Sequence, residues 1–298
     1  MNQPRFLPGF VEFNLPTEPG VEIHGLHSGT GPAVLLLHGH PQSLSTWQFV
    51  APALVRAGFR VVLTDLRGYG DSSRPEGGDN HVNYSKRAMA RDQIAVMCAL
   101  GHDRFTVIGH DRGGRVAHRM ALDFPAAVER LAVLDIAPTA TMYALTDKVF
   151  ATRYFWWFFL IQPAPLPERL IGADPEFFLR THLVAQSRTP DVPAEATVQE
   201  YLRCYLLPGT LHAICEDYRA AATIDLEHDA ADAHRRIEAP LLALWGAKGV
   251  VGELYDVLAT WREKALQVSG TALPCGHLLQ EEVPEATADA LLAFLRVN

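Results

Sequence analysis

The sequence contains no apolar run long enough to cross a membrane. Its longest run, 154–161, has eight residues, whereas a spanning helix needs about 20. The first ten residues lack a basic start followed by an apolar stretch, so no signal peptide is predicted. These absences predict a soluble, cytoplasmic protein without a membrane partner.

The sequence is also poor in cysteine and has no excess of positive charge. Its four cysteines show neither a C-x-x-C pair nor zinc-ligand spacing, which favours reduced thiols and predicts no metal site. The formal net charge of −8 argues against a nucleic-acid partner. With 48% apolar and 20% charged residues over 298 positions, the chain has the composition of one large folded domain or of a domain with an insertion.

Short apolar runs recur along the chain and are separated by segments of helix length, such as 85–100 and 112–124. Runs that are apolar on both faces are typical of strands buried between layers of helices. Their alternation with helices predicts an α/β fold with a mostly parallel, doubly wound sheet. The predicted strands are 33–37, 60–64, 105–108, 131–134 and 241–244.

One long segment interrupts this alternation. Residues 141–232 are rich in aromatic residues, proline and helical patches, and no clear buried strand is predicted there. We expect this segment to form a mostly helical cap inserted into the α/β core. The core is then made of two parts, residues 1–140 and 233–298.

The residues that follow the predicted strands suggest a catalytic site, because ligands of open α/β sheets bind at the carboxyl ends of the strands. Gly109-His110-Asp111-Arg112-Gly113 has the form of the sharp strand-to-helix turn that exposes a nucleophile. Taken alone, Asp111 could cap the next helix, Asp135 could be a solvated carboxylate, and His277 could be an ordinary loop histidine. Their order along the chain, nucleophile then acid then histidine, favours catalysis.

An aspartate at the nucleophile position selects the reaction. A serine that displaces a leaving group from saturated carbon would form an ether, which water does not cleave. A carboxylate forms an alkyl ester instead, and His277 can direct water at the carbonyl carbon of that ester. Asp111 therefore predicts substitution at saturated carbon, such as dehalogenation or epoxide opening, rather than esterase, lipase or peptidase activity.

Several motifs spread along the chain carry a family resemblance. They are 38–41 (HGHP), 65–72 (DLRGYGDS), 109–115 (GHDRGGR), 134–139 (LDIAPT), 162–168 (QPAPLPE), 215–220 (CEDYRA) and 276–277 (GH). Together they resemble those of the haloacetate (fluoroacetate) dehalogenases, which belong to the α/β-hydrolase superfamily. The first two motifs are shared with epoxide hydrolases, whereas the D-R-G-x-R motif and the motifs of the cap are specific.

The resemblance implies a role for each matching residue. Asp111 is then the nucleophile, His277 the base that activates water, and Asp135 the acid that orients His277. Arg112 and Arg115 would hold the substrate carboxylate, a role that suits guanidinium groups three residues apart on one helix. The backbone N–H groups of His40 and Arg112 would stabilise the oxyanion of ester hydrolysis.

The family also binds the departing halide in its cap, through a histidine, a tryptophan and a tyrosine. Trp157 and Tyr218 match two of these positions, but Trp156 stands where the family has histidine, and Gln186 falls where its members have an aromatic residue. The resemblance thus implies a haloacetate dehalogenase that needs no metal or cofactor. We expect it to prefer chloroacetate and bromoacetate to fluoroacetate, and to form a homodimer.

Two other functions stay open at this stage. An epoxide hydrolase would use the same nucleophile with two cap tyrosines, drawn from Tyr154, Tyr201, Tyr205 and Tyr218. The paired arginines disfavour it, because a neutral epoxide needs no paired cations. A ligand receptor that has lost catalysis is disfavoured by the complete set of Asp111, Asp135 and His277. Halide release from chloroacetate, compared with diol formation from styrene oxide, separates all three.

Overall fold

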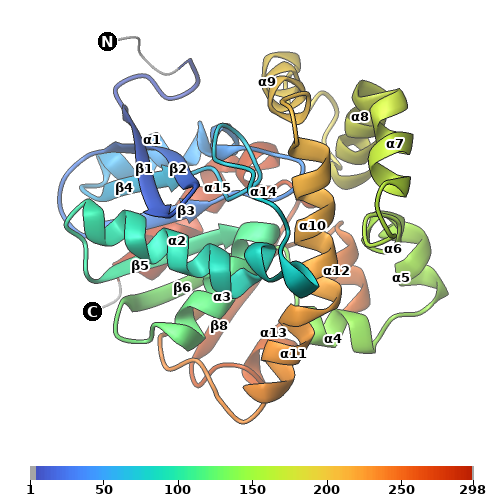
Figure 1. Cartoon of the computed structure of the whole chain (residues 1–298). Coiled ribbons are helices and arrows are strands. Elements are labelled where there is room, and N and C mark those ends of the chain that lie inside the picture. Colours follow the sequence, from blue (N-terminus) through green and yellow to red (C-terminus); the bar gives the residue numbers. More distant parts are fainter. Residues whose placement is uncertain (1–4, 297–298) are drawn as a thin grey trace.

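The computed structural model describes residues 5–296, which are built around one eight-stranded sheet (Figure 1). The strand order is β1-β2-β4-β3-β5-β6-β7-β8. Neighbouring strands from β4 to β8 are parallel, while β2 pairs antiparallel with both β1 and β4. The strands are β1 (Val11–Glu18), β2 (Val21–Ser28), β3 (Ala33–Leu37), β4 (Arg60–Thr64), β5 (Phe105–His110), β6 (Val128–Leu134), β7 (Leu241–Gly246) and β8 (Val268–Leu273).

Helices cover both faces of this sheet. Those that precede β6 are the 3-10 helices η1 (Leu44–Trp47) and η2 (Asp79–Tyr84) and the α-helices α1 (Val50–Arg56), α2 (Lys86–Ala99) and α3 (Arg112–Asp123). Those that follow β7 are α12 (Val250–Leu254), α13 (Val257–Arg262), α14 (Leu279–Glu282) and α15 (Pro284–Leu295). No helix among residues 5–296 is long and apolar enough to cross a membrane.

The side chains of β3 show why its sequence is apolar throughout. Leu35 and Leu37 pack in the cluster that contains residues of α2 and α3, and Val34 and Leu36 pack on the opposite face, with α1 and α15. Successive residues of a strand point to opposite faces, so a strand between two helix layers buries all of them. The predicted doubly wound α/β fold is confirmed.

The five predicted strands are the central ones, and three further strands were missed. β1 alternates between exposed and half-buried residues, and β8 does so over most of its length. β2 carries the polar His24 among its buried positions and ends with the half-buried His27 and Ser28. β1 and β8 are the outer strands of the sheet, where one face or edge meets water, so a search for continuous apolar runs does not find them.

A run of eight helices lies between β6 and β7, and no strand lies among its residues, all of which the structure describes; we call residues 139–231 the helical insertion. Figure 1 shows most of it on one side of the sheet. Helix α10 packs against α7, α9, α11 and η2. The helices are α4 (Thr139–Ala144), α5 (Lys148–Arg153), α6 (Phe155–Phe159), α7 (Leu166–Ala173), α8 (Pro175–Gln186), α9 (Glu195–Tyr205), α10 (Thr210–Ala222) and α11 (Ile224–Ala231).

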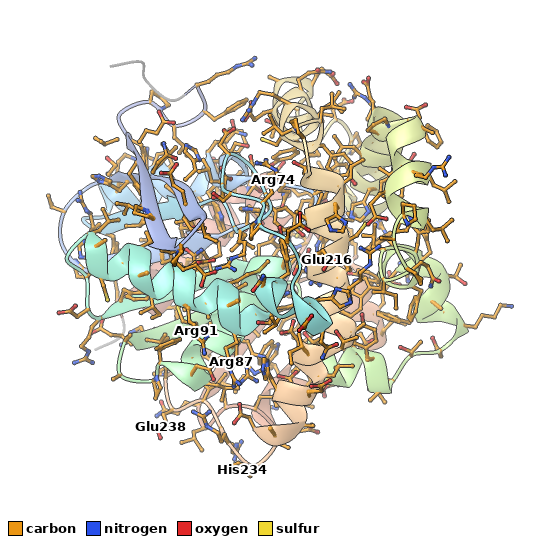
Figure 2. The ribbon with its side chains drawn as sticks, in the orientation of Figure 1. Arg74, Arg87, Arg91, Glu216, His234 and Glu238 are labelled. Atoms are coloured by element: carbon orange, nitrogen blue, oxygen red, sulfur yellow. The ribbon has the colours of Figure 1, made fainter. Side chains whose placement is uncertain are left out.

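Polar side chains join the helical insertion to the rest of the molecule. Glu216 of α10, labelled in Figure 2, lies 2.7 Å through Oε2 from His81 Nδ1 in η2. Arg74, also labelled there, donates from Nε to Thr210 Oγ1 over 2.7 Å. These contacts fix α10 beside the loop that precedes α2, and α10 in turn brings its residues to the carboxyl end of the sheet.

Candidate active site

The turn between β5 and α3 places Asp111 at the carboxyl end of a central strand. Asp111 has φ 42° and ψ −113°, a backbone conformation that few residues other than glycine adopt. The flanking glycines make the turn possible. A Cβ on Gly109 would lie 2.4 Å from the Gly113 carbonyl oxygen, and a Cβ on Gly113 would lie 2.5 Å from the His38 carbonyl oxygen. The strain is of the kind that persists at functional sites.

The Asp111 carboxylate is buried but electrostatically stabilised. Its Oδ2 accepts a hydrogen bond from the His40 backbone N–H over 3.1 Å. Burial raises the pKa of Asp111, but His277, Arg115 and Arg112 oppose burial and hold the pKa well below its usual value. The group is therefore an anion at neutral pH, which is the form that a nucleophile needs.

His277 and Asp135 form a hydrogen-bonded pair beside this turn. His277 Nδ1 lies 2.6 Å from Asp135 Oδ2, and Asp135 Oδ1 accepts from the Gly246 backbone N–H over 2.8 Å. Because a carboxylate only accepts, Nδ1 carries the proton and Nε2 keeps its lone pair. The buried Nε2 has no partner among the described residues, so this nitrogen is available as a base.

The charges around His277 tune its basicity. Burial lowers the pKa of His277, but the carboxylates of Asp135, Asp111 and Glu282 outweigh burial and raise it. The pKa of Asp135 is raised, because the effect of burial exceeds the opposing effect of the hydrogen bond from His277. A protonated imidazolium at His277 is thereby stabilised.

The two predicted carboxylate-binding arginines have different surroundings. Arg112 is fully buried, and its Nε and Nη2 donate to Asp217 of α10 over 2.7 and 2.8 Å. Asp217 also pairs with Lys86 and accepts from the Tyr69 hydroxyl. The charge of Arg112 is thus compensated, and only its Nη1 lacks a partner among residues 5–296.

Arg115 has no carboxylate within ion-pair distance in the described part of the chain. Its Nη1 donates to Thr139 Oγ1 over 2.8 Å and to the Ala137 carbonyl oxygen over 3.2 Å. Its buried Nε has no partner among the described residues. Burial lowers the pKa of Arg115 and the Asp111 carboxylate opposes this. Arg115 is therefore a buried cation beside Asp111 with spare capacity to bind an anion.

Aromatic residues of the helical insertion cover these arginines. The Arg115 guanidinium lies 4.6 Å from the centre of the Trp157 ring, and that of Arg112 lies 4.2 Å from the centre of the Tyr218 ring. Trp156 is placed differently. Its ring packs 4.2 Å from that of His182, between ring centres, and it lines a small cavity shared with His277.

His182 of α8 is a site residue that sequence reasoning missed. It is buried, its Nδ1 lacks a partner in the described structure, and its Nε2 lies 2.9 Å from the Gln186 side-chain nitrogen. Its ring centre is 4.8 Å from that of His40. Burial lowers the pKa of both histidines, that of His40 to about 3, so both rings are neutral. No motif marks position 182; only the folding of α8 over the His40 loop reveals it.

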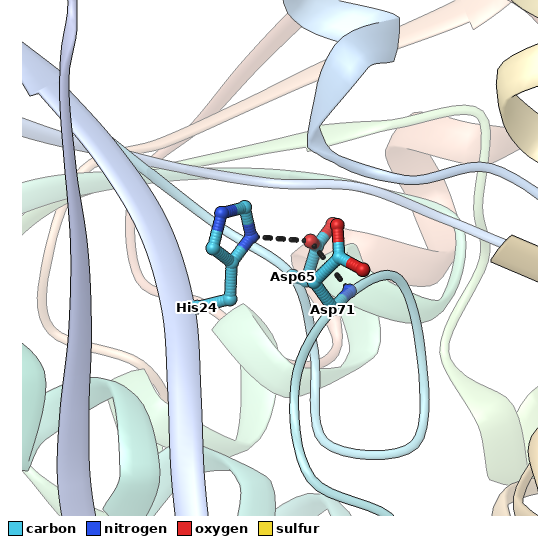
Figure 3. A group of neighbouring side chains, drawn as sticks. All are labelled: His24, Asp65 and Asp71. Carbon is cyan, nitrogen blue, oxygen red and sulfur yellow. Dashed lines mark hydrogen bonds and ion pairs between the residues drawn. The ribbon is translucent and has the colours of Figure 1, made fainter. Parts of the chain in front are cut away.

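A separate cluster of His24, Asp65 and Asp71 has the composition of a cation site (Figure 3). Its ligand atoms lie within 4.8 Å of one another. Asp65 Oδ2, however, is 2.8 Å from His24 Nδ1 and accepts the Asp71 backbone N–H, and Oδ1 accepts the Leu44 N–H. Burial lowers the pKa of His24, but Asp65 opposes this and raises it to about 9. The cluster is accounted for as an ion pair that fixes the 65–72 loop.

Comparison with known proteins agrees with this architecture. A family model described as the alpha/beta hydrolase fold matches residues 32–284. The chain is 45% identical over 276 residues to a fluoroacetate dehalogenase from Burkholderia sp., covering 92% of this chain and 90% of the relative. It is 35% identical over 279 residues to a soluble epoxide hydrolase from Corynebacterium sp. (strain C12), covering 92% and 94%. A crystal structure of a candidate acyltransferase from Salmonella enterica superposes with a TM-score of 0.96 at 56% identity, covering 98% and 97%.

The fold and these matches agree on the class of the protein. The mostly parallel sheet with helices on both faces is that of an α/β hydrolase, and the protein is a hydrolase. Within the α/β-hydrolase superfamily, the chain belongs to the haloacetate dehalogenase family. The resemblance seen in the sequence motifs is confirmed at this level.

Proposed function

We propose that this hydrolase converts haloacetate-type 2-haloacids to 2-hydroxy acids and halide. The observation that carries the proposal is Arg115, a buried cation without a carboxylate partner in the described residues, on the first turn of the helix that follows Asp111. A buried charge is costly unless it is paired. A substrate carboxylate pairs with it, and the guanidinium fork matches such a group. The helical insertion acts as the cap that closes the site.

The reaction has two steps. In the first, an Asp111 carboxylate oxygen attacks the carbon that bears the halogen, and the halide leaves with the bonding electrons. In the second, His277 Nε2 removes a proton from water, whose oxygen attacks the Asp111 carbonyl carbon of the ester. The backbone N–H groups of His40 and Arg112 stabilise the oxyanion. Collapse releases the 2-hydroxy acid, which takes the proton back from His277. The second proton of the water stays on the Asp111 carboxyl group, and its loss to solvent restores the carboxylate.

The second candidate is an epoxide hydrolase with the same nucleophile. Tyr154 and Tyr218 are both buried in the helical insertion, and burial together with the Asp111 charge raises the pKa of each well above its usual value. Both hydroxyls are therefore protonated and able to donate to an epoxide oxygen. A neutral epoxide, however, leaves the Arg115 charge without a partner.

A panel of substrates decides between the two. We expect halide release from chloroacetate, bromoacetate and 2-chloropropionate, followed by ion chromatography, and no diol from styrene oxide. Diol formation without halide release would refute the dehalogenase proposal and support the epoxide hydrolase.

Arg115→Lys tests the assignment of the carboxylate site. Lysine keeps the charge but loses the planar fork, so binding of chloroacetate should weaken by roughly 1.5–3 kcal/mol, the scale of hydrogen bonds to charged groups. We expect this as a higher KM. Arg112→Lys serves as the comparison, because its fork is mainly occupied by Asp217; it should raise KM less and lower the melting temperature more. Two results would refute the assignment of Arg115 as the carboxylate site: normal affinity for chloroacetate in the Arg115→Lys variant, or turnover of an uncharged haloalkane equal to that of chloroacetate.

The choice of halogen is tested at Trp156. Fluoride is a poor leaving group and a strongly hydrated ion, so its departure needs several short hydrogen bonds from the site. Trp157 and Tyr218 offer one neutral donor each, and Trp156 offers at most one more on a large ring. We therefore expect chloroacetate and bromoacetate to react well and fluoroacetate slowly.

Trp156→His should raise fluoroacetate turnover more than chloroacetate turnover, with fluoride release measured by ion-selective electrode. His182 lies against Trp156, so His182→Ala serves as the control for loss of packing. Defluorination by the unmodified enzyme as fast as dechlorination would contradict this account of the halide site.

We also propose that two copies associate through the helical insertion. It exposes apolar side chains on two neighbouring helices: Leu166 and Leu170 on α7 and Phe177 and Val184 on α8. Large exposed apolar patches mark association surfaces.

A further inference from the structure

One carboxylate binds the backbone on both sides of His277. Glu282, at the end of α14, accepts the Gly276 N–H through Oε2 and the Leu278 N–H through Oε1, each over 3.0 Å. Glu282 as a residue is 9% exposed. The loop that carries the catalytic histidine is therefore held by a group outside the Asp111–Asp135–His277 set.

The same carboxylate reaches the helical insertion. Glu282 Oε2 accepts the Arg188 N–H over 2.8 Å and the Thr189 hydroxyl over 3.0 Å. His277 itself, which lies between Gly276 and Leu278, donates its backbone N–H to the Gln186 carbonyl oxygen of the insertion over 3.0 Å. The N–H groups of three consecutive residues, 276 to 278, are thus all bonded either to Glu282 or to the insertion.

Gly276 allows this close approach. A Cβ there would lie 2.5 Å from the Gln186 carbonyl oxygen and 2.9 Å from Glu282 Oε1. The glycine in the sequence pair Gly276-His277 therefore has a physical reason, because a side chain would separate the histidine loop from the segment 186–189.

Glu282 is also a charge near His277. It forms no ion pair with any residue in the described range 5–296, and its four hydrogen bonds come from backbone N–H groups and one hydroxyl. Its negative charge is among those that raise the pKa of His277. The other titratable groups around His277 are Asp135, Asp111, His110 and His182, together with Tyr154 and Arg188 of the helical insertion, which line a small cavity with it.

We propose that Glu282 is a positioning residue that holds the His277 loop against segment 186–189 of the helical insertion and thereby sets the rate of ester hydrolysis. The inference rests on the proposed function, because ester hydrolysis is its second step. The first step does not use His277 as a base, so Glu282 acts on one half of the reaction.

Glu282→Gln tests this proposal. Glutamine has one acceptor oxygen and an NH2 group that faces other donors, so the variant loses at least the hydrogen bonds made by one carboxylate oxygen. The rapid release of one equivalent of halide should persist, while steady-state turnover of bromoacetate falls about 10- to 100-fold, the cost of a misplaced catalytic group. The alkyl ester should then accumulate on Asp111 and be visible by mass spectrometry.

The pH profile separates positioning from a purely structural role. Neutral His277 is the active base, so ester hydrolysis rises with pH through its pKa. Removal of the Glu282 charge lowers that pKa, and the acid limb of kcat should move to lower pH. Glu281→Gln is the matched control, because Glu281 is also buried but its side chain accepts hydrogen bonds from Gln42, Thr46 and Tyr201 rather than from the histidine loop. The pH profile of this control variant should not move.

NMR titration of the His277 ring keeps the test independent of the substrate. Two results together support both proposals: the His277 pKa is lower in the Glu282→Gln protein, and the unmodified enzyme releases halide. The same shift in a protein that never releases halide supports the positioning role and refutes the proposed function. Equal loss of the burst and of turnover, or an unchanged His277 pKa, overturns the positioning role.

If Glu282→Gln does not fold, Thr189→Val removes only the contact made by the insertion's hydroxyl. It should slow ester hydrolysis severalfold and leave the halide burst intact. An unchanged rate of ester hydrolysis in that variant would overturn the proposal.

Discussion

Asp111→Asn is expected to abolish turnover of every haloacetate, with kcat lower by about ten-thousand-fold or more, as for other enzymes that lose their nucleophile. The reason is chemical, because a neutral amide does not displace halide from carbon. Halide release followed by ion chromatography measures the loss directly.

This substitution is well suited to the site. Asparagine is among the residues that tolerate positive φ, so the backbone conformation of the turn, with φ 42°, should be kept. The side-chain oxygen can still accept the His40 N–H. A folded variant, judged by circular dichroism and melting temperature, that still releases halide at the normal rate would exclude Asp111 as the nucleophile.

His277→Asn should have the second largest effect, and of a different kind. The first step needs no base, so the variant should release one equivalent of halide rapidly and then stop. The alkyl ester on Asp111 should accumulate, because no group removes the proton from the attacking water. Mass spectrometry after incubation with bromoacetate should locate the added group on the peptide that contains Asp111.

The unmodified enzyme provides the matching pH test. The pKa of His277 is raised by Asp135, Asp111 and Glu282 against the effect of burial. Turnover depends on the neutral His277 ring. As the solution is acidified, turnover should therefore be lost at a higher pH than it would be with a histidine of ordinary pKa. Continued turnover in the Asn variant, without an adduct, would exclude His277 as the base.

The sequence predicts the fold where burial is complete. Strands β3 to β7 lie between helix layers, so each contains a run of buried apolar residues that is visible without a structure. The outer strands β1 and β8 have one face or edge in water and carry polar residues. Their place in the sheet depends on pairing with strands far along the chain, which local patterns do not record.

The residues of the candidate site also fall into two groups, those that the sequence predicts and those that only the folded structure reveals. Asp111, Asp135 and His277 are predictable because their chemistry demands those residue types after particular strands. Asp217, which pairs with Arg112, lies 105 residues away from it in the sequence. Glu282 and His182 likewise reach the site from α14 and α8, and nothing local to either residue marks it as part of the site. Such partners become visible only when the folded chain brings them together.

A single turnover in water labelled with heavy oxygen tests the central claim most directly. With enzyme in excess over chloroacetate, the ester route transfers an unlabelled Asp111 oxygen to the product, and the label enters the Asp111 carboxylate. We expect unlabelled glycolate in the first turnover and heavy oxygen in the peptide that contains Asp111. Labelled glycolate with an unlabelled Asp111 peptide would show that water displaces the halide directly, and would contradict the ester mechanism.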